Sequence, residues 1–159
     1  MMARTPFILF LAVFVIGCSN RTDPLQEPSL AVPENTSSEA PSLDDIERCI
    51  MVTAELNGWL PERGSDRGRL KAQRHVRSHR AFIDIFYDEE SIDVQYADSI
   101  NLNYVDRPPR SVRRYKDMNY TGPVIHPIYN QWVETLSNDL EVRLRQPDFL
   151  CERMQGIRN

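Results

Sequence analysis

The sequence predicts an α+β fold: an N-terminal helix, a three-stranded antiparallel sheet, and a C-terminal helix, with both helices packed on one sheet face. Two observations predict it. Residues 79–104 alternate apolar and polar side chains with a period of two and are rich in β-branched and aromatic residues, which is typical of half-buried strands. The flanking segments, 42–57 and 127–146, repeat apolar residues at helical spacing.

The N-terminus has the features of an export signal. Arg4 supplies positive charge, and the apolar run 7–16 is too short to span a bilayer as a helix. Val-Ile-Gly then directly precedes Cys18, which resembles the lipobox of bacterial lipoproteins. The resemblance implies removal of the signal peptide 1–17, a diacylglyceryl thioether on Cys18, and an acyl chain such as palmitate on the new amine. The alternative is an ordinary secretory signal.

The segment after the signal predicts a tether. Residues 18–41 contain several prolines among polar side chains and show no apolar periodicity, so we expect a lipidated, disordered linker. Its ends would lie roughly 25–30 Å apart as a coil and about 70 Å apart as polyproline II. Ser19 stands where enteric lipoprotein sorting would read an Asp. By that analogy we expect anchoring in the bacterial outer membrane, facing the periplasm. Residues 42–159 then form one globular domain.

The first predicted helix begins at Ser42, which forms a capping-box-like arrangement with Asp45, and ends before Gly58. Residues 62–68 read as a polar loop, and Arg69–His75 as a first strand. The predicted inward residues are Ile46, Cys49, Ile50 and Thr53 in the helix, and Leu70 and Ala72 in the strand.

The central hairpin follows, with the loop 88–91 between its strands. Its predicted buried face comprises Ala81, Ile83, Ile85, Ile92, Val94 and Tyr96. The opposite face carries Phe82 and Phe86 beside charged residues, which is unusual for a face turned to solvent. If nothing covers these two rings, we expect a partner to dock there.

The last predicted helix begins after His126, has Pro127 at its first position, and ends at Pro147. Its apolar stripe comprises Tyr129, Trp132, Val133, Leu136, Leu140 and Leu144. Cys49 and Cys151 remain as an even pair in an exported protein, so we expect a disulfide. The alternative is two unpaired thiols.

Asp98, Ser99 and His126 supply the residue types of a hydrolase, but no nucleophile-elbow pattern or oxyanion loop accompanies them. We favour a structural interpretation. Asp98, Ser99 and Asn101 would cap a turn that leaves the hairpin, while His126 and Asn130 would serve the start of the last helix.

No metal or cofactor is expected. His75 and His79 are four residues apart on a segment that reads as strand and turn, and neighbouring arginines would repel a cation. Gly-rich phosphate loops are absent from the sequence as well.

A basic cluster lies in the irregular segment 105–124, and it comprises Arg107, Arg110, Arg113, Arg114 and Lys116. It can contact an anionic surface such as lipid head groups, lipopolysaccharide or peptidoglycan. The alternative is a solvated loop. The net charge of −4, together with export, argues against nucleic acid as a partner, so we expect none.

Two polar motifs carry a family resemblance: Asp98-Ser99-Ile100-Asn101-Leu102-Asn103-Tyr104, and Ile125-His126-Pro127-Ile128-Tyr129-Asn130-Gln131-Trp132. With His79-Arg80-Ala81 and Gly58-Trp59, they resemble a loose family of small, uncharacterised bacterial lipoproteins. The resemblance implies a fold and a location but no activity. The basic insertion 105–124 departs from it.

The leading functional hypothesis is a membrane-anchored periplasmic lipoprotein that acts as a non-enzymatic binding or structural module of the cell envelope. It combines an anchor, a linker and a small domain without a convincing catalytic set. An envelope protein, lipopolysaccharide or peptidoglycan would be its partner. The alternative is a small envelope hydrolase that uses Asp98, Ser99 and His126.

Overall fold

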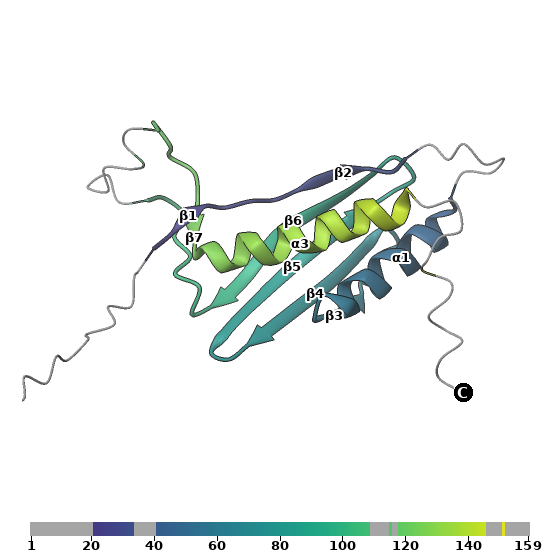
Figure 1. Ribbon diagram of the computed structural model, residues 1–159, viewed down its shortest axis with the longest axis horizontal. Coiled ribbons are helices and arrows are strands. Elements are labelled where there is room, and N and C mark those ends of the chain that lie inside the picture. The colour runs from purple at the N-terminus through teal and green to yellow at the C-terminus, as the bar shows by residue number, and fades with distance from the viewer. Residues whose placement is uncertain (1–20, 34–40, 109–114, 116–117, 146–150, 152–159) are drawn as a thin grey trace, which may run out of the picture.

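The computed structural model describes residues 21–33, 41–108, 115, 118–145 and 151 (Figure 1). The helices are α1 (Leu43–Leu56) and α3 (Pro127–Leu144). The strands are β1 (Asp23–Pro24), β2 (Ser29–Ala31), β3 (Trp59–Arg63), β4 (Arg69–Val76), β5 (His79–Tyr87), β6 (Ser91–Ile100) and β7 (Val124–Ile125). The fold is α+β, as predicted, but its sheet is larger than predicted.

Among the described residues, the main sheet has five antiparallel strands in the order β2-β6-β5-β4-β3, and β1 pairs with β7 in a separate two-stranded sheet. The prediction of a three-stranded sheet is therefore wrong. It anticipates β4, β5 and β6 but misses the strands at both edges. The second hairpin strand is also longer than predicted, because β6 continues to Ile100 through part of the supposed exit turn.

The missed strands lack the usual sequence signals for physical reasons. β3 contains Pro61 and ends in charged residues, and Pro removes a backbone donor. β3 tolerates this loss because it lies at the edge of the sheet, where none of the described strands pairs with its outer side. β2 has only three residues, too few to show an alternation, and pairs with residues 91–93 of β6. Both strands form because β4 and β6 already present a free edge.

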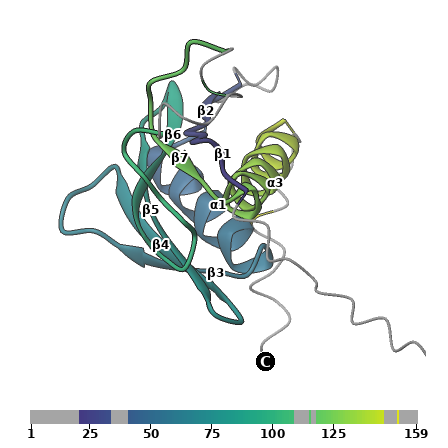
Figure 2. The ribbon, with the colours of Figure 1, turned by 90° about the vertical axis from the view of Figure 1, so that its left-hand side faces the viewer.

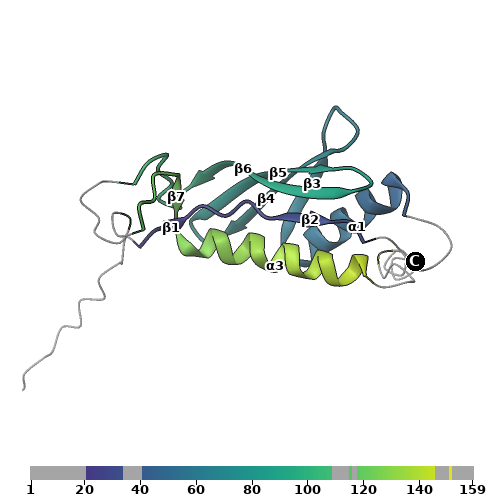
Figure 3. The same ribbon diagram turned by 90° about the horizontal axis from the view of Figure 1, so that it is seen from above.

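Helices α1 and α3 lie on the same face of the sheet (Figure 3). The predicted capping box forms at the start of α1, where the Asp45 backbone N–H donates to the Ser42 side chain. The predicted apolar stripes of both helices are buried against the predicted inward residues of β4, β5 and β6. This layer is the hydrophobic core. No helix in the described part of the chain is long and apolar enough to cross a bilayer.

The N-terminal segment 21–33 is part of the fold. β1 pairs with β7, β2 extends the main sheet, and Val32 joins the core cluster. The expectation of a disordered linker over 18–41 is therefore wrong for these residues. The composition misleads because the segment gains its order from backbone pairing and from contacts with residues distant in the sequence, not from its own apolar pattern.

A disulfide joins Cys49 of α1 to Cys151, as predicted. Both residues are buried, and their Cα atoms lie 5.0 Å apart across a sequence separation of 102 residues. The bond therefore ties the chain beyond α3 to the first helix. Closing so long a loop restricts the unfolded chain by an amount worth about 4.7 kcal/mol in the chain-entropy description.

Candidate functional site

The sheet has one face that the described helices leave uncovered, which we call the open face (Figure 2). Its side chains alternate with those of the core along each strand. Cross-strand pairing aligns them in rows: Leu60 of β3 opposes Gln73, which opposes Phe82, which opposes Asp98. A second row runs from Glu62 through Lys71 to Asp84. The open face therefore mixes apolar and charged side chains.

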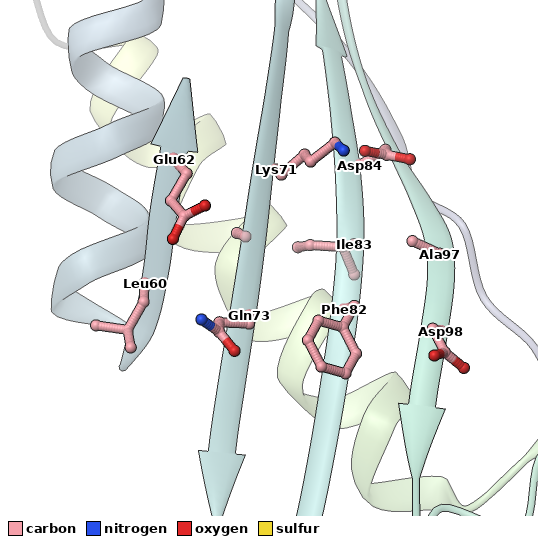
Figure 4. Close-up of a pocket in the computed structure, with 10 residues that line it drawn as sticks. Leu60, Glu62, Lys71, Gln73, Phe82, Ile83, Asp84, Ala97 and Asp98 are labelled. Atoms are coloured by element: carbon pink, nitrogen blue, oxygen red, sulfur yellow. The ribbon is translucent and has the colours of Figure 1, made fainter. Parts of the chain in front are cut away.

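A groove of about 330 Å³ lies on the open face (Figure 4). The residues that line it are Leu60, Glu62, Lys71, Ala72, Gln73, Phe82, Ile83, Asp84, Ala97 and Asp98. A β-bulge shapes it: Phe82 opposes Asp98 and Ile83 opposes Tyr96, so Ala97 is an extra residue between them. The bulge brings the small Ala97 side chain to the groove, and the Phe82 ring forms an apolar wall.

Phe82 and Phe86 both lie on the open face, but their surroundings differ. The guanidinium of Arg69 sits 5.2 Å from the centre of the Phe86 ring, in a cation–π arrangement. Arg69 also forms an ion pair with Asp84 at 2.9 Å. Phe86 is therefore covered from within the sheet, whereas Phe82 lines the groove next to Leu60, which is 62% exposed. Of the two rings, Phe82 is therefore the one that is more open to contact by a partner.

The charges at the groove are mainly negative. Glu62, Asp84 and Asp98 line it together with one cation, Lys71. Asp84 is paired with Arg69, so Glu62 and Asp98 are the groove carboxylates that form no ion pair among the described residues, and Lys71 lies between Glu62 and Asp84. Such a groove favours a ligand that combines an apolar group with a positive charge, and it disfavours a polyanion.

The side chains of Asp98, Ser99 and His126, the residues of the hydrolase hypothesis, form no hydrogen bonds with one another in the described structure. Asp98 lines the groove and Ser99 points to the other face, where its hydroxyl lies 2.9 Å from the Tyr96 hydroxyl. Asp98 accepts the backbone N–H of Ser99 at 2.7 Å. His126 is the N-cap of α3, as predicted, and its Nδ1 accepts the backbone N–H of Ile128 at 3.2 Å.

The tautomer of His126 matters for this hypothesis. Burial, and then the proximity of His79, lowers the pKa of the His126 imidazole and favours its neutral form. Since Nδ1 accepts a hydrogen bond, the proton of the neutral ring sits on Nε2. In a Ser-His-Asp arrangement, by contrast, Nε2 must take the proton of the serine. The arrangement therefore suits helix capping.

The three histidines also form no metal site. His79 and His126 stack with ring centroids 5.5 Å apart, and the His79 Nδ1 bonds the carbonyl of Asn101 at 2.6 Å. His75 is exposed on β4 opposite Arg80. Among the described residues, no group of three or more His, Cys, Asp or Glu side chains can hold a metal ion.

Asn101 and Asn130 take part in tertiary contacts that the sequence does not reveal. Asn101 has a positive φ of 58° and donates its side-chain amide to the carbonyl of Ser78, which links the end of β6 to the β4–β5 turn. Asn130 is buried in α3 and binds the N-terminal segment. Its amide donates to the Pro24 carbonyl at 2.8 Å and accepts the Gln26 N–H at 3.1 Å. The predicted capping role of Asn130 is thus replaced by a clamp.

The basic cluster is described only in part. Arg107 is exposed after β6 and does not line the groove. Arg110, Arg113, Arg114 and Lys116 lie outside the described residues, as does Cys18. Tyr115, within the same stretch of sequence, is buried, and its hydroxyl oxygen lies 2.7 Å from that of Thr22.

A second cleft, of about 510 Å³, opens between the end of α1 and the start of α3. It is lined by Leu56, Asn57, Gly58, Arg74, Ile128, Gln131, Trp132 and Thr135. The guanidinium of Arg74 stacks on the Trp132 ring at 4.9 Å, and burial lowers its pKa. This contact closes the core at that corner.

Comparison of the chain with protein-family models, with curated proteins and with solved structures finds no match.

Proposed function

We propose that this protein is a lipid-anchored module of the bacterial cell envelope, held at the outer membrane facing the periplasm, which binds a partner protein at its open face. The anchor is inferred from the Val-Ile-Gly sequence before Cys18 and from Ser19 after it. The disulfide between Cys49 and Cys151 supports an oxidising compartment. The resemblance to small bacterial lipoproteins points the same way.

The groove on the open face is the observation that supports partner binding. The half-buried Phe82 ring borders the groove beside Leu60, which is 62% exposed, and apolar side chains gathered at a hollow are typical of interaction sites. The carboxylates Glu62 and Asp98, which have no ion-pair partner in the described part of the chain, add charge complementarity for a protein segment that places an apolar side chain beside a Lys or Arg. Lipopolysaccharide and peptidoglycan would instead suit the basic cluster, whose described member, Arg107, does not line this groove.

Acylation is tested by growing cells with a labelled fatty acid. The label should enter the protein, and Cys18→Ser should abolish both the label and membrane sedimentation. If the wild-type protein stays unlabelled and soluble, the anchor is wrong.

Binding is tested by placing a photo-crosslinking amino acid at Phe82 in living cells. Val142, which is 57% exposed on α3 and distant from the groove, is the matched control position. We expect a discrete protein adduct from position 82 alone, weakened by Asp98→Lys. Identical adducts from both positions, or none from position 82, would contradict the proposal.

The hydrolase alternative receives no support from the geometry. The Ser99 hydroxyl and the Asp98 carboxylate lie on opposite sheet faces, and His126 uses Nδ1 as an acceptor. We therefore propose no second function.

A further inference from the structure

The described N-terminal segment is fastened to the domain along its length. Tyr115 bonds Thr22, the amide of Asn130 bonds the segment on either side of Leu25, and the Val94 N–H donates to the Pro28 carbonyl at 2.9 Å. Further on, β2 pairs with β6. The fold therefore fixes where this segment starts, at the end of the molecule formed by β1 and β7, which we call the β1–β7 end (Figure 1).

The sequence leaves little chain between this end and the proposed anchor. Only Ser19 and Asn20 separate Cys18 from Arg21. Three peptide steps span at most about 11 Å even when fully extended. If Cys18 carries acyl chains, which is the proposed function on which this inference rests, its Cα lies at the lipid head groups. The β1–β7 end is then within the same short reach of the bilayer surface.

The exposed residues at the β1–β7 end suit that position. Val105, which bridges to Val124 of β7, is 42% exposed, and Met118 is 49% exposed. Met118 lies on the turn that the Tyr120 N–H closes by donating to the Tyr115 carbonyl. Arg107 is exposed two residues after Val105, with Asp106 between them bonded to the Tyr104 hydroxyl, and Arg21 is exposed two residues before β1. Apolar side chains beside arginines are typical of surfaces that rest in a head-group layer.

We propose that the β1–β7 end, through Val105 and Met118, lies on the surface of the bilayer that holds the acyl chains of Cys18. The domain then rests directly on the membrane. The β5–β6 turn at residues 88–90 faces away from it, since Glu90 accepts the Val32 N–H at the far end of the N-terminal segment. The open face stands to the side, where a second membrane protein or a periplasmic protein can approach it.

The test places an environment-sensitive fluorophore on single introduced cysteines in the full-length lipidated protein. Met118→Cys and Val105→Cys probe the β1–β7 end, and Glu89→Cys, on the exposed far turn, is the matched control. With Cys18 acylated and Cys49 bonded to Cys151, the introduced thiol is the one that reacts. The protein is reconstituted into vesicles of phosphatidylethanolamine and phosphatidylglycerol whose acyl chains carry bromine, which quenches at short range.

We expect labels at 118 and 105 to lose emission in brominated vesicles and to shift to the blue, while the label at 89 does neither. Using two positions keeps the test valid if one variant fails to fold. Equal quenching at 118 and 89 in protein whose mass shows an acylated Cys18 overturns this inference and leaves the proposed anchor intact. A mass without acyl chains overturns both.

Discussion

The two faces of the sheet are built from the same strands and have opposite characters. In β5, Ile83 and Ile85 are each 1% exposed beneath the helices, while Phe82 and Phe86 alternate with them on the open face. The covered face is mainly apolar and lies beneath the helices, with Arg74 stacked on Trp132 at one corner. The open face mixes rings with charges, and an arginine of the sheet covers one ring. The difference teaches that one strand can stabilise the fold with one set of side chains and leave the other set free for recognition.

Breaking the disulfide should have the largest effect, because it acts on the covered side through α1. Reduction, or Cys49→Ser with Cys151→Ser, should lower the free energy of unfolding by up to about 4.7 kcal/mol, the value for a loop of this length. Urea denaturation with and without reductant measures it. An unchanged midpoint on reduction would show that the bond contributes nothing.

A pair of neighbouring truncations compares the faces directly. Ile83→Ala removes a buried side chain and should cost about 2–5 kcal/mol of unfolding free energy, since it leaves a cavity under the helices. Phe82→Ala, one residue away, should cost clearly less because the ring lines an open groove. Chemical denaturation of both variants measures the two losses of unfolding free energy. Equal losses would mean that the open face is as important to folding as the covered one.

The third prediction tests the hydrogen bonds by which Asn130 of α3 holds the N-terminal segment 21–33. Asn130→Ala should cost about 1–3 kcal/mol of unfolding free energy, because it removes two part-buried hydrogen bonds, to the Pro24 carbonyl and from the Gln26 N–H, each worth about 0.5–1.5 kcal/mol. Asn138→Ala, on the exposed side of the same helix, is the control and should be near neutral. Susceptibility of residues 21–33 to proteolysis should rise in the first variant alone.

The smallest effect concerns pH. The Tyr87 hydroxyl donates to Glu47, and this bond, followed by the ion pair with Arg63 at 2.5 Å, lowers the pKa of Glu47. A lowered folded-state pKa stabilises the protein above the unfolded value, near 4.3, and the contribution disappears as pH falls through the folded value. Glu47→Gln should therefore flatten the loss of stability between neutral and acidic pH. Glu55→Gln, at an exposed position of the same helix, is the matched control.

Long periodic segments predicted their own structure well. Both helices and the central hairpin follow from apolar spacing, and the cap at Ser42 and the N-cap at His126 follow from local side-chain chemistry. The edge strands could not be predicted in this way, because β2 and β3 depend on free edges supplied by distant residues. Asn130 is hidden for the same reason: its partners lie 104 and 106 residues away.

The groove could be predicted only in part. The outward position of Phe82 follows from the alternation, but the bulge at Ala97 and the cover that Arg69 provides for Phe86 depend on strand register. Because β6 continues through Asp98 and Ser99, their side chains point to opposite faces, and the polar composition of that segment conceals the strand.

The disulfide divides the backbone amides of the described fold into those inside the loop that it closes and those outside it. The cross-link between Cys49 and Cys151 encloses β3 to α3 in a covalent ring, while β1 and β2 lie outside it. A segment outside the ring can detach by breaking hydrogen bonds alone, without opening the enclosed layers. Backbone amides of β2 should therefore exchange with deuterium well before those of β5, through a local opening whose rate does not depend on global unfolding.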